Sequence, residues 1–89
     1  MQFSSDEKKR KANLDTHGFD FVDAENVFEG PTFTYDRFRY REQRFVTLGF
    51  LHGVAVSIVH TETEDEIHVI SFRRATKKEE IILFTSLED

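Results

Sequence analysis

The spacing of apolar residues changes once along this chain, at about Pro31. On the N-terminal side, apolar residues recur at helical intervals, at Phe21, Ala24 and Phe28. Asp20 is a residue type that favours the helix N-cap, and proline cannot continue a helix. The pattern therefore predicts a short helix that Asp20 caps and that ends before Pro31.

Polar residues predict a helix before this one. Ser4 and Glu7 have the three-residue spacing of a capping box, so the helix is expected to begin near Ser5. Acidic residues come first and Lys and Arg follow, an order that suits the helix dipole. The helix is expected to end at His17 and Gly18, because glycine readily adopts the left-handed cap conformation.

After Pro31 the apolar period becomes two, and β-branched and aromatic residues become frequent. This pattern predicts four strands, over residues 32–36, 44–50, 54–60 and 67–72. His52 and Gly53 resemble the two-residue turn of a tight hairpin, so the second and third strands should pair antiparallel. The polar connection at residues 62–66 is also too short for a crossover and predicts another hairpin.

Thr76 and Glu79 repeat the capping-box spacing at the start of a last helix. The apolar side of that helix is predicted to consist of Ile81, Ile82, Phe84 and Leu87. The expected fold class is α+β: two N-terminal helices, a four-stranded antiparallel sheet and a C-terminal helix. We expect residues 1–89 to form a single domain, since so short a chain has no room for a second core.

Composition narrows the possible functions. The 89 residues include ten Phe and no Cys, so packing must form the core, and disulfides and thiolate metal sites are excluded. The formal net charge of −5 argues against nucleic-acid binding through bulk charge and leaves room only for a local basic patch. The polar start and the short apolar runs predict no secretory signal and no membrane segment, hence a cytoplasmic protein.

Three titratable residues near the last predicted hairpin are candidates for proton transfer: His60, Glu62 and His68. If the loop is residues 63–65, His60 lies directly across from His68, with Cβ atoms about 5 Å apart. If the loop is only residues 64–65, the pairing shifts by one and the two rings lie on opposite faces. The absence of Gly favours the longer loop. The plainer interpretation is two strand histidines with no catalytic task.

The end of the last strand is the best candidate phosphate site. Arg73 and Arg74 stand just before a helix N-terminus, where two guanidinium groups and the amides of residues 75–78 can meet an anion together. Lys77 and Lys78 add positive charge there. The plainer interpretation is that one arginine pairs with an acidic residue of the helix on the solvent face.

A second basic segment alternates with aromatic residues. Arg37, Arg39 and Arg41 would lie on one face of a strand, with Phe38 and Tyr40 on the other. Such a ribbon can follow an RNA strand while Tyr40 stacks on a base. Arg44 is a further candidate for RNA binding. The competing interpretation is an edge strand whose arginines prevent aggregation.

A metal site is the weaker alternative. Imidazole and carboxylate groups of His60, Glu62, Glu66 and His68 suit zinc or manganese, but carboxylates beside a turn are usually only solvated. We predict no metal and no cofactor.

The landmarks of the chain form a family pattern. They include Phe3, Asp6, Lys9, Asn13-Leu14, His17-Gly18, Phe21, Ala24, Phe28, Pro31, Arg44, Gly49, His60-Thr61-Glu62, the block from Ile70 to Ala75, and Glu79. In this spacing the chain resembles the BrnT family of bacterial toxins. The resemblance implies a RelE-like fold, ribonuclease activity, and inhibition by an antitoxin encoded beside the toxin.

The resemblance also assigns residues. It implies a metal-independent endoribonuclease in which Arg73 and Arg74 hold the phosphate, Glu62 or a histidine moves the proton, and Lys9 adds positive field. The implied partner is a BrnA-like ribbon-helix-helix antitoxin in a higher-order toxin–antitoxin complex.

The chain departs from the family pattern at three places. The family usually has Arg at the positions of Thr63 and His68, and Tyr near Leu83 or Phe84. These departures support a rival hypothesis, a catalytically weak binding module that only complexes a DNA-binding antitoxin.

Overall fold

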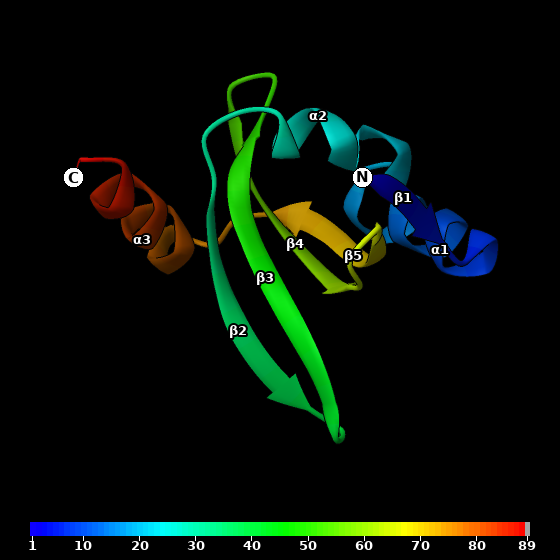
Figure 1. The fold of residues 1–89 in the computed structure, drawn as a ribbon. Helices are drawn as coiled ribbons and strands as arrows, with labels where there is room; N and C mark the ends of the chain where they lie inside the picture. The colour runs from blue at the N-terminus through cyan, green and yellow to red at the C-terminus, as the bar shows by residue number, and fades with distance from the viewer. Residues whose placement is uncertain (89) are drawn as a thin grey trace.

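In the computed structural model, which describes residues 1–88, helices lie on both faces of one five-stranded mixed sheet (Figure 1). The elements are β1 (Gln2–Ser5), α1 (Glu7–His17), the 3₁₀ helix η1 (Phe21–Asp23), α2 (Ala24–Phe28), β2 (Phe33–Arg39), β3 (Glu42–Leu51), β4 (Val54–Glu62), β5 (Glu66–Arg74) and α3 (Lys77–Leu87). The strand order is β1-β5-β4-β3-β2. The α+β class is confirmed. No helix within residues 1–88 is both long and apolar enough to cross a membrane.

The N-terminus corrects two predictions. The sheet has a fifth strand, because β1 pairs in parallel with the first half of β5, and Ser4 lies opposite His68. Ser4 is therefore not a helix cap. The N-cap of α1 is Asp6, whose carboxylate accepts hydrogen bonds from the amides of Lys8 and Lys9. The expected sheet of four strands was wrong for this reason.

The predicted end of the first helix and the predicted cap at Asp20 are confirmed, although the segment that Asp20 caps is divided into η1 and α2. Gly18 closes α1 in the left-handed conformation with φ 77°, and the Asp20 carboxylate accepts a hydrogen bond from the amide of Val22. Helix α1 has little apolar character and is attached to the sheet by Asn13. Its side-chain amide donates to the carbonyl of Phe72 and accepts from the amide of the same residue, at 2.7 and 3.1 Å.

The hairpin between β4 and β5 has the shorter of the two loops considered. The amide of Thr63 donates to the carbonyl of Glu66, and Thr61 pairs with His68. The favoured alternative, His60 directly across from His68, was wrong: His60 pairs with Val69, and a bulge follows between Val59 and His60. The two rings lie on opposite faces of the sheet.

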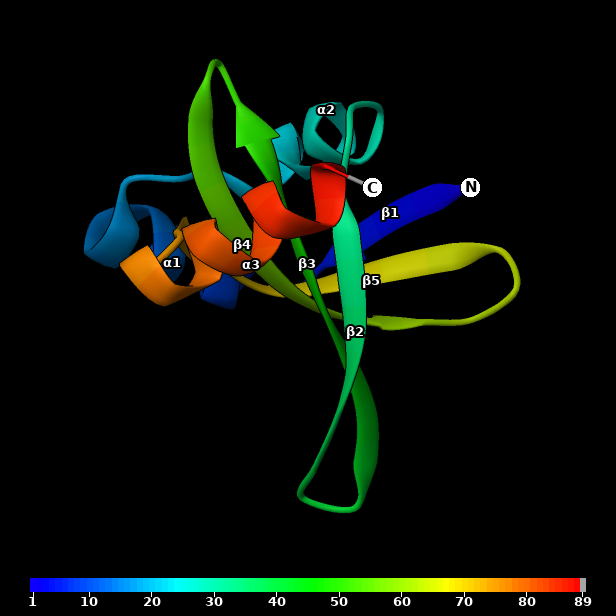
Figure 2. The same cartoon turned by 90° about the vertical axis from the view of Figure 1, so that its left-hand side faces the viewer.

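The two faces are covered to different extents. On the face that we call the helical face, α1, η1 and α2 cover a core of Phe21, Ala24, Val27, Leu51, Val56, Ile58, Ile67, Val69 and Phe72. On the opposite face, α3 covers a smaller core of Val46, Leu48, Ala55, Ala75 and Leu83. The half of this second face that α3 leaves open is here called the open face. Figure 2 shows β2 and β3 running out from beneath α3.

Helix α3 begins as predicted but buries a different side. Thr76 and Glu79 form the complete capping box. The fully buried residue is Leu83, with Ile82 partly buried, whereas Ile81, Phe84 and Leu87 of the predicted apolar side are exposed. The apolar residues of this helix surround most of it, so their spacing did not determine which side faces the sheet.

Candidate functional site

Four arginines from three strands line a groove of about 400 Å³ on the open face. Arg37 and Arg39 come from β2, Arg44 from β3 and Arg73 from β5; Val59, Ile70 and Ser71 complete the lining. We call this hollow the arginine groove. Arginine presents a planar fork of donors that matches phosphate, so the groove has the chemistry of a site for a phosphodiester chain.

The strand register explains why these arginines meet. Arg37 lies directly opposite Arg44 in the β2–β3 pair, and Arg39 follows Arg37 at the two-residue interval that keeps one face. Arg73 reaches the same face from β5, past the bulge. Arg41 does not belong to this row: it lies in the turn after β2 with φ 61°, so the predicted row of Arg37, Arg39 and Arg41 was wrong in its last member.

Two of the four arginines are ion-paired. Arg44 donates to Glu42 at 2.8 Å, and Arg73 forms a two-point contact with Glu79 at 2.8 and 3.0 Å. Among residues 1–88, no carboxylate lies within 4.0 Å of the guanidinium groups of Arg37 or Arg39. These two side chains are the available cations of the groove.

The pair of Arg73 and Glu79 also belongs to the start of α3. Glu79 accepts a hydrogen bond from the amide of Thr76 as well as from Arg73, and these donors lower its pKa although burial opposes the charged form. The same contact raises the pKa of Arg73. The plainer interpretation of Arg73, an ion pair with an acidic residue of the last helix, is therefore correct as a description of the contact.

The predicted meeting of Arg73, Arg74 and free helix amides does not occur. Arg73 pairs with Ser57 and Arg74 with Val56, so the two side chains leave β5 on opposite faces. The amide of Ala75 donates to the carbonyl of Ala55, and that of Thr76 to Glu79. Only Arg73 reaches the arginine groove.

His60 is a core residue. Its ring is fully buried on the helical face between Phe28 and Phe45, and its Nε2 lies 2.7 Å from Oγ1 of Thr47. Burial lowers the pKa of His60 to about 4, so the ring is neutral at physiological pH. Glu62 lies on the same face, with Oε1 3.5 Å from Nδ1 of His60.

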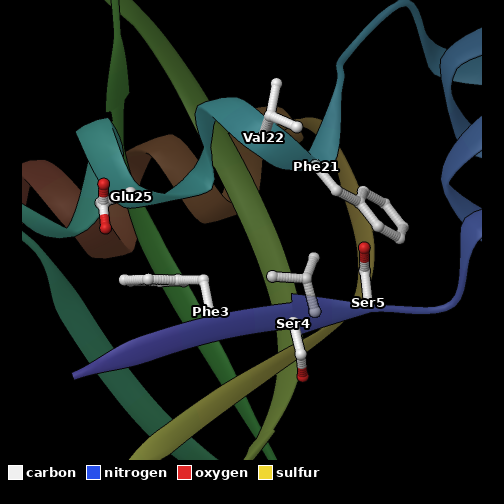
Figure 3. Close-up of a pocket in the computed structure, with 7 residues that line it drawn as sticks. Phe3, Ser4, Ser5, Phe21, Val22 and Glu25 are labelled. Atoms are coloured by element: carbon white, nitrogen blue, oxygen red, sulfur yellow. The ribbon is translucent and has the colours of Figure 1, made fainter.

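His68 lies on the other face of the sheet, the open face. Its Nδ1 is hydrogen-bonded to Oγ of Ser4 at 2.8 Å, across the β1–β5 pair. Figure 3 shows the Ser4 side chain on the side of β1 opposite to Phe3 and Ser5, hence away from the helical face. Of the three proton-transfer candidates, only His68 therefore shares a face with the arginine groove. The four residues of the alternative metal site are divided between the two faces in the same way.

A second hollow, on the helical face, contains none of the predicted site residues. It measures about 240 Å³ and lies between β1 and the η1–α2 segment (Figure 3). Phe3 and Phe21 form its apolar walls, and Glu25 stands at its edge. It offers no cationic side chain to a phosphate.

The model for the family described as "Ribonuclease toxin, BrnT, of type II toxin-antitoxin system" matches residues 6–79. The chain belongs to the BrnT family. Its fold is similar to the crystal structure of the Brucella abortus ribonuclease toxin BrnT, with a TM-score of 0.70 and 25% sequence identity, over 86% of this chain and 99% of that one. Among curated protein sequences, none matches.

BrnT membership confirms the predicted resemblance. It describes the chain as a ribonuclease toxin with an antitoxin partner. The part of the chain that the family model matches includes the residues of the arginine groove, His68 and Lys9. It ends at Glu79, before most of α3.

The remaining predicted residues lie away from the groove. Lys9 is on α1, which packs against the helical face, and Lys77 and Lys78 form the exposed first turn of α3. Ser4, which contacts His68, was predicted as a helix cap and not as a site residue, because its strand had not been recognised. Ser71, which lines the groove, was named only as part of the family pattern.

Proposed function

We propose that this chain is a metal-independent endoribonuclease toxin that binds single-stranded RNA in the arginine groove and acts in the cytoplasm. The supporting observation is the convergence of Arg37, Arg39, Arg44 and Arg73 on one groove in a protein whose net charge is −5. Such a local concentration of guanidinium groups attracts a phosphate backbone that the rest of the surface repels. The arginines also supply positive charge that can stabilise the phosphorane-like transition state.

The proposed reaction is transfer of the phosphodiester to the neighbouring 2′-oxygen. The 2′-hydroxyl gives its proton to a base as its oxygen bonds to phosphorus, and the bond to the 5′-oxygen breaks as that oxygen takes up a proton. His68 is our candidate for proton transfer, since it is the one of the three predicted titratable residues that shares a face with the arginine groove. Ser4 would hold its Nδ1 and leave Nε2 for the substrate.

The arginines would divide the binding. Arg37 and Arg39, which have no carboxylate partner in residues 1–88, would hold phosphates along the strand. Arg73 would act at the reacting phosphate, because Glu79 and the N-terminus of α3 fix the orientation of its guanidinium group.

The test is cleavage of a long single-stranded RNA in the presence of EDTA. We expect the parent to retain its rate in EDTA, and Arg73→Ala to lose about 10²–10³-fold, because charge stabilisation grows in the transition state. His68→Gln should lose a similar factor. Circular dichroism of each variant shows whether it is folded.

Glu62→Gln separates the two faces in the same assay. The structure places Glu62 on the helical face, so this variant should cut RNA at the parent's rate. A collapse of activity in Glu62→Gln with His68→Gln unaffected would move the reaction to the helical face and contradict our assignment.

The second candidate function is a binding module without catalysis. Its support is that Arg44 and Arg73 are already ion-paired and that His68 replaces the arginine usual in the family. If the parent binds its antitoxin but cuts no RNA, this function is the correct one.

The proposed antitoxin is a BrnA-like ribbon-helix-helix protein encoded beside the toxin. We expect the two proteins to form a higher-order toxin–antitoxin complex. Co-expression with the neighbouring gene should yield a stable complex that does not bind RNA. Recovery of only free toxin at micromolar concentration and low salt would contradict this partner.

A further inference from the structure

Two hairpin turns of the same length differ in the residues that form them. In the β3–β4 turn, His52 and Gly53 have φ values of 51° and 80°; in the β2–β3 turn, Tyr40 and Arg41 have 53° and 61°. The left-handed region suits glycine and asparagine and is unfavourable for bulky side chains. The β2–β3 turn therefore holds two long side chains where smaller residues would form the turn at lower cost.

Nothing in the fold requires the ring of Tyr40. The pairing of β3 with β4 extends only to Phe45, so Glu42 to Arg44 pair with β2 alone and the hairpin projects beyond the rest of the molecule (Figure 1 and Figure 2). Tyr40 is 80% exposed, the highest value among the large hydrophobic residues in the described part of the chain. A buried packing role is therefore excluded.

The ring lies at the outer end of the arginine groove. The guanidinium carbon of Arg39 is 5.6 Å from its centroid and that of Arg44 is 5.9 Å away. Both arginines also line the groove, so a phosphate chain that follows them passes beside the ring. Side chains held in unfavourable backbone conformations are concentrated at functional sites.

We propose that Tyr40 is a stacking platform for an unpaired base of the RNA that lies in the arginine groove, an inference that rests on the proposed function. Aromatic side chains stack on bases of any identity because every base has a π-face. In a duplex the faces of a base are covered by its neighbours, so the platform selects single strands.

The charge of the hairpin favours RNA over a protein as the occupant of this tip. The hairpin contains four arginines, Arg37, Arg39, Arg41 and Arg44, and two acidic residues, Asp36 and Glu42. An exposed ring among cations, in a chain with net charge −5, has the combination of charge and aromatic surface that single-stranded nucleic acids require.

The experiment measures binding rather than cleavage. The probe is a fluorescent single-stranded RNA of about a dozen nucleotides, a length within the range of single-strand binding sites. Its 2′-hydroxyls are methylated so that it cannot be cut. Tyr40→Asn should bind about tenfold more weakly than the parent, the loss of one stacked base. Tyr40→Trp should bind like the parent. A probe with abasic sites should bind the parent and Tyr40→Asn equally.

Stability provides a second readout. Because asparagine tolerates the left-handed conformation, the Tm of Tyr40→Asn should equal or exceed that of the parent. A fall of several degrees would show that the ring stabilises the hairpin and would overturn the proposal. His52→Asn is the matched control at the same position of the other turn, and its RNA affinity should equal the parent's.

Arg37→Ala distinguishes this inference from the proposed function. If Arg37→Ala binds the probe more weakly and Tyr40→Asn binds it like the parent, RNA binding in the arginine groove is supported and the proposal that Tyr40 stacks on a base is wrong. If both bind like the parent, both proposals fail. If Tyr40→Asn loses affinity only for the antitoxin, the tip is a protein-docking site and the stacking proposal is overturned.

Discussion

The two faces of the sheet give one residue type opposite properties. His60, on the helical face, is fully buried between two phenylalanines, and its pKa is lowered to about 4. His68 lies on the other face, is partly exposed and is held by a serine hydroxyl. One face is sealed by three helical segments, and the other is half covered by α3.

This difference shows that the face of the sheet on which a histidine lies, and not the residue type alone, determines whether its ring is accessible. Both histidines lie in the same hairpin, and a shift of one residue in its register would put the two rings on the same face of the sheet. The covered face supplies stability and the open face keeps its arginines and histidine accessible. Variants on the two faces should therefore have separable effects.

The largest expected difference is in the free energy of unfolding. Phe72 is fully buried on the helical face and stacks on Phe19 with ring centroids 5.1 Å apart. Phe72→Ala should cost about 3–5 kcal/mol, from lost burial and the cavity left behind. Arg37→Ala, on the open face, should change stability by less than about 0.5 kcal/mol. Urea unfolding of both variants measures the contrast, and comparable losses would show that the open face also carries the fold.

The next effect depends on pH. The pKa of His60 is about 4 in the folded protein and has an ordinary value of 6.5, so between these values the unfolded chain binds more protons. The stability that His60 contributes is fully present above pH 6.5 and is lost as the pH falls toward 4. The expected loss is about 3 kcal/mol, at about 1.4 kcal/mol per pH unit.

His60→Gln isolates this effect from the titration of carboxylates. The amide keeps a polar group near Thr47 and does not titrate, so the unfolding free energy of this variant should depend less on pH across the window. Parallel pH profiles for the parent and His60→Gln would mean that His60 is charged, or solvated, in the folded protein.

The smallest effect lies at the boundary between the arginine groove and α3. Glu79 closes the capping box and binds Arg73, so Glu79→Ala should cost about 1 kcal/mol, the usual contribution of a helix cap. Glu79→Gln keeps a hydrogen-bond acceptor and should cost less. Thermal unfolding compares the two, and a loss in Glu79→Gln as large as that in Glu79→Ala would assign the stability to the ion pair instead of the cap.

Local signals predicted most elements of the fold. The Gly18 cap, the Asp20 cap, the capping box of Thr76 and the hairpin at Gly53 each depend on residues within a few positions of one another. Such signals do not require knowledge of distant parts of the chain.

The predictions that failed depend on distant contacts or on weak signals. Strand β1 has four residues, and its partner lies more than sixty positions away. The β4–β5 loop contains no residue with positive φ, so the absence of glycine did not exclude a two-residue turn. The apolar residues of α3 nearly surround it, and packing alone selected Leu83.

The sequence predicted which residues belong to the candidate site, but it did not predict that they meet in one groove. Arg37, Arg39, Arg44 and Arg73 had each been selected for their charge, on two separate segments. Only the register of β2, β3 and β5 brings them to one groove, and the extra residue of β5 at the bulge places Arg73 opposite Ser57, on the side of the groove. The division of the candidates between the two faces required the structure.

The parallel pairing of β1 with β5 also limits how early during translation the protein can complete its fold. Ser4 and His68 are 64 residues apart, and the two hydrogen bonds that tie Asn13 to Phe72 span 59 residues. A nascent chain cannot form these contacts until nearly all of it has left the ribosome, and contacts of such long range slow folding. An N-terminal fragment that stops before β5 has neither Arg73 nor His68, so the proposed function predicts that the toxin is inactive while it is still being translated.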